Sequence, residues 1–132
     1  MNPDDGEHDG VTLWHNPRCS KSRGALALLT EQGVEPEVVR YLEARPDRAA
    51  LEDVLRRLGT DDPRAILRTG EKVYRERGLA DADRDTLLDA MAADPILIER
   101  PIAMVGDRAV VGRPPERVLE LLDAPTPPRD GR

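Results

Sequence analysis

The chain has 132 residues with a formal net charge of −6, and 39% of the residues are apolar. This length fits a single domain, which can bury roughly two thirds of its unfolded surface without disulfides or a metal. The acidic balance and the scarcity of aromatic residues argue against nucleic-acid binding. The single Cys excludes an internal disulfide or iron–sulfur cluster, and no apolar run approaches the ~20 residues of a membrane span. We therefore expect a cytoplasmic monomer that binds neither nucleic acid nor a membrane.

The two ends of the chain differ in composition from its middle. Residues 1–10 are acidic and polar, and residues 123–132 contain several Pro residues without apolar periodicity. Segments of this kind do not bury enough apolar surface to stay ordered. We expect disordered tails at 1–10 and 123–132, on either side of one domain at 11–122.

The first part of that domain predicts a βαβ unit. Residues 11–14 form a β-prone run, and an apolar stripe over 20–32 predicts a helix that stops at Gly33. Residues 37–42 predict the second strand. A strand, helix and strand in this space form a crossover that makes the two strands parallel.

A run of helices follows the second strand. Asp47 is a predicted N-cap, and Asp62-Pro63 has the pattern of a cap followed by Pro at the first helical position. The apolar spacing predicts helices at 48–58, 63–67, 72–77 and 85–93. This part of the chain is therefore a helical insertion.

The last part of the domain predicts a hairpin and a helix. Residues 102–105 and 108–111 are β-prone, and the two residues between them favour a type I′ or II′ turn. Pro114-Pro115 opens the final helix. The element order predicts an α/β fold with a small mixed four-stranded sheet, covered by helices and interrupted by the insertion after the second strand.

Cys19 lies in the predicted loop between the first strand and the first helix, where ligands of open α/β sheets tend to bind. A helix start with Arg18, Lys21 and Arg23 beside it favours an anion, and lowers a thiol pKa from ~8.5 to roughly 3.5–7.5. A buried, inert Cys is the alternative, and composition alone favours it. The polar and cationic neighbours favour a reactive thiol instead.

Two polar residues flank this Cys, and each has two interpretations. His15 either orients and charges the loop or is an ordinary hydrogen-bonded loop residue. Ser22 either donates a hydrogen bond to the thiolate or is a polar residue of the first helical turn. We expect no metal site, because His15 and Cys19 are too few ligands.

Three arginines lie at the ends of predicted elements, where loops tend to carry function: Arg68, Arg100 and Arg113. The planar guanidinium suits oxyanions because it offers paired, charge-assisted hydrogen bonds. Any single Arg is more often a surface charge, and spacing alone does not single out this trio.

Four short motifs occur in a fixed order: His15-Asn16-Pro17-x-Cys19, Arg64-x-x-x-Arg68, Arg100-Pro101-Ile102 and Arg113-Pro114-x-Glu116. By their order and spacing, residues 11–122 resemble the arsenate reductase family of the thioredoxin-like fold, in its glutaredoxin-coupled type. Ser-Lys follows the Cys, where well-studied members have Gly-Thr. The chain thus resembles a branch with a His-Asn-Pro-Arg-Cys-Ser-Lys-Ser motif.

The resemblance implies a role for each of these residues. It implies that Cys19 is the nucleophile on arsenate and that His15 favours its thiolate. It implies that Arg68, Arg100 and Arg113 bind the oxyanion and its reduced products. Arsenate or a similar oxyanion is the implied substrate.

The resemblance also implies a cis bond before Pro101 and a particular source of electrons. One Cys cannot form and resolve its own disulfide, so the reducing equivalents must come from external thiols. The resemblance implies glutathione as a co-substrate and glutaredoxin as a partner, with no bound cofactor.

Two other functions remain open. One is a thiol oxidoreductase acting on another substrate, such as a glutathionylated protein. The other is a redox-linked regulator that binds a protein partner such as RNA polymerase, because the family also resembles regulators of that kind. Those regulators carry Cys-x-x-Cys, and Ser22 stands in place of the second Cys, which counts against this alternative.

Overall fold

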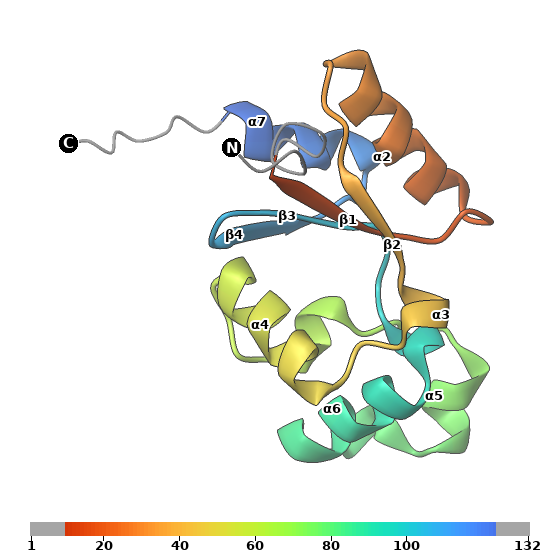
Figure 1. Cartoon of the computed structure of the whole chain (residues 1–132). Helices are drawn as coiled ribbons and strands as arrows, with labels where there is room; N and C mark the ends of the chain where they lie inside the picture. Colours follow the sequence, from red (N-terminus) through yellow and green to blue (C-terminus); the bar gives the residue numbers. More distant parts are fainter. Residues whose placement is uncertain (1–9, 124–132) are drawn as a thin grey trace.

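The structure is a computed structural model that describes residues 10–123, and Figure 1 shows its strands and helices. In chain order the elements are β1 (Val11–His15), α2 (Ser20–Glu31), β2 (Glu37–Arg40), α3 (Tyr41–Ala44), α4 (Arg48–Leu58), η1 (Pro63–Ile66), α5 (Lys72–Glu76), η2 (Leu79–Asp81), α6 (Arg84–Ala93), η3 (Pro95–Leu97), β3 (Ile102–Val105), β4 (Arg108–Val111), η4 (Pro115–Leu119) and α7 (Glu120–Asp123). The η elements are 3₁₀ turns. The predicted tails lie outside the described residues, apart from Gly10 and Asp123, and Asp123 closes α7 instead of starting a tail.

The four strands form one mixed sheet in the order β2-β1-β3-β4. β1 is parallel to β2, antiparallel to β3, and β3 is antiparallel to β4. The predicted βαβ unit, C-terminal hairpin and α/β fold class are therefore confirmed. In the hairpin turn Gly106 has φ +58 and Asp107 does not have a positive φ, which is the pattern of type II′ rather than type I′.

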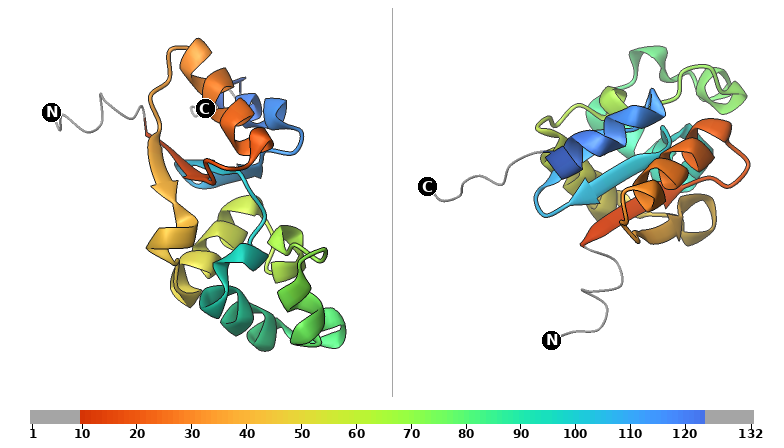
Figure 2. Two further views of the ribbon diagram at one scale, coloured as in Figure 1. Left: turned by 90° about the vertical axis from the view of Figure 1, so that its right-hand side faces the viewer. Right: turned by 90° about the horizontal axis from the view of Figure 1, so that it is seen from above.

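The sheet separates two hydrophobic cores. α2 and the C-terminal segment cover one face, and the helical insertion covers the other (Figures 1 and 2). Because neighbouring side chains on a strand point to opposite faces, Leu13 packs against α2 while Trp14 packs against the insertion. β3 divides its residues in the same way, with Ala103 in the first core and Ile102 and Met104 in the second.

The insertion is held to the sheet by the apolar face of α4. Leu51, Val54 and Leu55 are all at most 1% exposed, as the spacing of these positions predicts. The Asp47 side chain caps the helix by accepting a hydrogen bond from the Ala50 N–H at 2.9 Å, and Gly59 ends it in the left-handed region. The predicted cap, apolar face and stop of this helix are confirmed.

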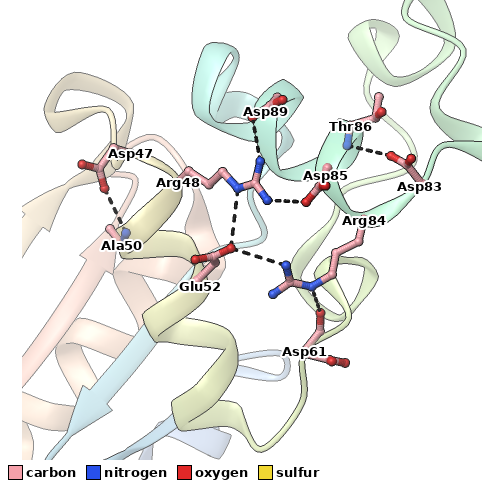
Figure 3. A network of polar contacts seen from close by, with 10 residues as sticks. All are labelled: Asp47, Arg48, Ala50, Glu52, Asp61, Asp83, Arg84, Asp85, Thr86 and Asp89. Atoms are coloured by element: carbon pink, nitrogen blue, oxygen red, sulfur yellow. Dashed lines mark hydrogen bonds and ion pairs between the residues drawn. The ribbon is translucent and has the colours of Figure 1, made fainter.

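Ion pairs on the outer surface join α4 to α6 (Figure 3). Arg48 forms ion pairs with Glu52, Asp85 and Asp89. Glu52 also accepts from Arg84, whose Nε donates to the Asp61 carbonyl at 2.7 Å. The side chains are largely exposed, so this network orients two helices more than it stabilises them.

Three predicted boundaries were wrong. The second strand ends at Arg40, because the chain turns there into α3 and buries Tyr41 against Trp14, with ring centroids 6.5 Å apart. The segment at 63–67 is a 3₁₀ turn, because Leu67 instead forms a β-bridge with Ile98. The C-terminal helix begins as the 3₁₀ turn η4, and only its last four residues are α-helical.

Within residues 10–123, no helix has both the length and the apolar character needed to cross a membrane.

Gly112 is a point of close approach between the end of β4 and its neighbours. A Cβ built there would lie 2.9 Å from Cγ of Pro101 and 2.9 Å from Cγ1 of Val118. The Gly112 N–H also donates to the Pro101 carbonyl at 2.8 Å, so the backbone has little room to move. Only glycine fits between these two side chains.

We therefore expect Gly112→Ala to lower the free energy of unfolding by about 1–3 kcal/mol, the usual cost of overpacking. Gly70→Ala is the matched control, because a Cβ at Gly70 meets nothing within 4 Å. That control should stay within about 1 kcal/mol of the parent protein. Urea unfolding measures both, and an equal effect of the two substitutions would contradict the close approach.

Candidate functional site

The loop between β1 and α2 is closed by hydrogen bonds that centre on Asn16. The Cys19 N–H donates to the Asn16 carbonyl at 3.0 Å, and the Arg18 N–H donates to its side-chain oxygen at 3.0 Å. Arg23 closes the other side by donating from Nη1 to the Pro17 carbonyl at 2.9 Å. The loop thus places Cys19, half-buried, at the N-cap of α2.

The environment of Cys19 favours the thiolate. Burial raises the pKa of this thiol, but the opposing effects are larger and the net pKa is lowered. Hydrogen bonding from the backbone N–H groups of Ser22 and Lys21 favours the anion, as do the charge and a hydrogen bond of the Arg100 guanidinium. The helix N-terminus therefore favours the thiolate as the sequence pattern predicts. The positive side chain that does so is Arg100, from a distant segment, rather than the adjacent Arg18, Lys21 or Arg23.

His15 acts as a neutral hydrogen-bonding residue rather than as a cation. Burial lowers its pKa, and the nearby charges of Arg40 and Arg23 lower it further. His15 is 6% exposed, and its Nδ1 lies 2.6 Å from the hydroxyl oxygen of Ser22, a fully buried residue. A neutral His15 adds no positive charge beside the thiol at neutral pH.

The Ser22 hydroxyl is used to fix the loop. Its oxygen accepts from the Asn16 N–H at 3.0 Å and contacts His15 Nδ1 on its other side, where the proton lies on one partner or the other according to the tautomer. The hydroxyl therefore ties the end of β1 to the first turn of α2. It is the backbone N–H of Ser22, not its hydroxyl, that lowers the pKa of Cys19.

The three predicted arginines meet at one carboxylate. Glu99 Oε1 lies 4.0 Å from Arg68 Nε, 3.6 Å from Arg100 Nη1 and 3.7 Å from Arg113 Nε. Arg68 has a second, shorter ion pair with Glu71, at 2.7 Å between Nη1 and Oε2. Segments that are far apart in sequence thus bring three guanidiniums to one carboxylate.

Backbone hydrogen bonds hold these segments in place. The Arg68 N–H donates to the Leu97 carbonyl and the Glu99 N–H donates to the Ile66 carbonyl, both at 2.8 Å. Arg113 donates from Nη1 to the Arg100 carbonyl at 3.2 Å. The arginine cluster therefore rests on a short β-bridge between the insertion and the segment that leads into β3.

Arg100 connects the arginine cluster to the thiol. It pairs with Glu99 and also favours the Cys19 thiolate, and its Nε is buried without a hydrogen-bond partner. The bond between Arg100 and Pro101 is cis, and so is the bond between Arg113 and Pro114. The oxyanion-binding role of the three arginines remains a prediction.

Two residues of this site were missed by sequence reasoning. Tyr41 is 1% exposed; burial raises its pKa, while the charges of Arg100 and Arg68 oppose that change. Its phenol therefore lies within the electrostatic reach of Arg100, Arg68 and Cys19, and it accepts a hydrogen bond from the Asn16 side chain. No local signal marks Tyr41, whereas Glu99 directly precedes one of the candidate arginines.

Comparisons with known proteins agree with this arrangement. The model of the ArsC family matches residues 14–121. A protein of Neisseria meningitidis serogroup A named arsenate reductase is 45% identical over 114 residues, which are 85% of this chain and 97% of that protein. A protein of Escherichia coli K12, named only as uncharacterized, is 50% identical over 114 residues, with 85% and 96% covered. The solved structure of an arsenate reductase from Vibrio cholerae superimposes with a TM-score of 0.81 at 47% identity, covering 83% of this chain and 95% of that one.

The thiol environment predicts how the alkylation rate of Cys19 depends on pH. We expect a midpoint well below ~8.5, the pKa of a free Cys. Arg100→Gln should raise that midpoint, because it removes a positive charge and a hydrogen bond from the thiolate. Rates measured with iodoacetamide across the pH range check both statements.

Arg57→Gln is the control, because Arg57 lies on α4 and pairs with Asp53. It should leave the midpoint unchanged. A wild-type midpoint near that of a free Cys, or an equal shift in both variants, would show that the loop does not activate the thiol.

Proposed function

Because the chain belongs to the ArsC family, we propose that it reduces arsenate to arsenite with the Cys19 thiolate as the nucleophile. The observation that carries the proposal is the lowered pKa of Cys19 beside Arg100, itself part of the arginine cluster around Glu99. Relatives that are 40–45% identical are named arsenate reductase, which supports the same substrate.

Arg68, Arg100 and Arg113 hold the arsenate. Guanidiniums bind tetrahedral oxyanions through paired, charge-assisted hydrogen bonds, and three of them spread the charge over several oxygens. Arg100 places the bound anion beside the sulfur, because it favours the thiolate and shares Glu99 with the other two. Nucleophile and electrophile are thereby held together by one residue.

In the first chemical step the Cys19 sulfur attacks the pentavalent arsenic. An arsenic–sulfur bond forms, and an arsenate oxygen leaves as water after protonation. No electrons change hands in this step, and the arsenic stays pentavalent. The arginines stabilise the negative oxygens of the adduct.

In the second step the thiolate of glutathione attacks the Cys19 sulfur. A disulfide between glutathione and Cys19 forms, and the arsenic–sulfur bond breaks with its electron pair going to arsenic. The arsenic leaves in the trivalent state, so two electrons have passed from the two sulfurs. Glutaredoxin then accepts the glutathione group by thiol–disulfide exchange, which restores the Cys19 thiolate.

Two pockets that are lined in part by residues of the site offer space for the external thiol. A pocket of about 290 Å³ is lined by His15, Arg18 and Arg40, among others. A second pocket of about 550 Å³ is lined by Glu99, Arg113 and apolar residues of β4. Pockets of this size accommodate small molecules, and their cationic residues suit the carboxylates of glutathione.

Arsenate-dependent oxidation of NADPH, coupled through glutathione, glutathione reductase and glutaredoxin, tests this function. The wild-type protein should give turnover that stops when arsenate is left out. Turnover on glutathionylated substrates with none on arsenate would instead support a general thiol oxidoreductase. Capture of RNA polymerase that is unaffected by Cys19→Ser would support the regulator.

We expect Cys19→Ser to abolish turnover in this assay and leave the fold nearly unchanged. A serine hydroxyl is a poor nucleophile at neutral pH unless a strong base activates it, and His15 already contacts Ser22. Circular dichroism checks the fold of the variant. Substantial residual activity would mean that another residue is the nucleophile.

We expect replacement of any one of the three arginines by Ala to lower kcat/KM by roughly 10²–10³-fold, as when one oxyanion-hole donor is removed. Lys should rescue only part of this loss, because it lacks the planar fork. Arg56→Ala and Arg57→Ala are the controls on α4 and should retain full activity. Controls as damaging as Arg68→Ala would contradict the anion site.

A further inference from the structure

A carboxylate lies at the centre of the arginine cluster, where a site for anions would be expected to hold only positive charge. One oxygen of Glu99 is within 4.0 Å of nitrogens from all three arginines. Glu71 pairs with Arg68 as well. Three positive charges therefore face two negative ones, and the cluster keeps only one positive charge for a ligand.

The geometry of Glu99 differs from that of a structural counter-ion. Arg68 and Glu71 form a short ion pair at 2.7 Å, which is the distance of a charge-assisted hydrogen bond. Glu99 instead lies 3.6–4.0 Å from each of the three guanidinium nitrogens, and its closest backbone donor, the Arg100 N–H, is 3.4 Å away. Its oxygens are thus poorly matched to these donors and retain capacity to accept a further hydrogen bond.

The chemistry of a carboxylate determines which ligand can use that capacity. An ionised carboxylate accepts hydrogen bonds and donates none. An oxyanion bound by the three arginines brings one of its oxygens close to Glu99, since all three guanidinium groups lie within 4.0 Å of the Glu99 carboxylate. A bare oxygen is repelled there, whereas an oxygen that carries a proton donates a hydrogen bond.

We propose that Glu99 makes the site selective for oxyanions that carry a proton, such as hydrogen arsenate and hydrogen phosphate, over fully ionised ones such as sulfate. This inference rests on the proposed function, because it needs an oxyanion on the three arginines. It deepens that function by naming the residue that distinguishes arsenate from sulfate, which has a similar tetrahedral shape.

The test compares phosphate with sulfate as ligands that protect Cys19 from alkylation. Above the second ionisation of phosphate both ions are dianions, and they differ in one proton. The dependence of the alkylation rate on anion concentration gives an apparent Kd for each. The wild-type protein should bind phosphate at least about tenfold more tightly than sulfate, since one hydrogen bond to a charged group is worth about that much.

Glu99→Gln should bring this ratio close to one, mainly by tightening sulfate, because an amide can donate a hydrogen bond to a bare oxygen. Glu71→Gln is the matched control, since it removes one negative charge from the same cluster. It should tighten both anions and leave the ratio unchanged. If Glu99→Gln instead tightens both anions equally and leaves the ratio unchanged, as the control does, Glu99 acts only through its charge and the proposal is overturned.

The outcomes distinguish a failure of the proposed selectivity of Glu99 from a failure of the proposed arsenate reduction. Equal protection by the two anions in the wild-type protein overturns the selectivity of Glu99 but leaves arsenate reduction standing. Protection by neither anion removes the oxyanion site itself, and the proposal falls with it. If circular dichroism shows that Glu99→Gln is unfolded, the wild-type ratio alone decides.

Discussion

The antiparallel pairing of β1 with β3 is the constraint on which the site depends. Trp14 lies opposite Ile102, so the C-terminal end of β1 and the N-terminal end of β3 lie side by side at the same end of the sheet. The loop that carries Cys19 follows β1, and Arg100 precedes β3. A parallel pairing would have placed these two segments at opposite ends of the sheet.

The helical insertion completes the site because a β-bridge joins it to the segment that leads into β3. The β-bridge between Leu67 and Ile98 sets Arg68 beside Glu99, and the end of the hairpin adds Arg113 from the other side. Guanidiniums repel one another, and two carboxylates offset part of that repulsion. The cluster is therefore stable without a ligand, yet retains positive charge to bind one.

Within the loop of Cys19, the residues that fix the shape of the loop differ from the groups that favour the thiolate. Burial keeps His15 neutral, so His15 and Ser22 act by fixing the shape of the loop. The positive potential at the sulfur comes from the N-terminus of α2 and from Arg100. These two sources favour the thiolate without a positive charge on His15.

Local patterns in the sequence determined most of the fold and the position of the thiol. The apolar spacing of α4, the turn at Gly106 and the helix start at Cys19 each depend on a few neighbouring residues, so the sequence alone sufficed to predict them. The side-chain charge that favours the thiolate comes from the distant Arg100, which local patterns do not place beside Cys19. Only the tertiary structure decided that Tyr41 starts α3, where it is buried, instead of continuing β2. It also decided that Glu99 forms ion pairs with all three arginines. Such features depend on contacts between segments that are distant along the chain, and no local pattern encodes which side chains will share one carboxylate.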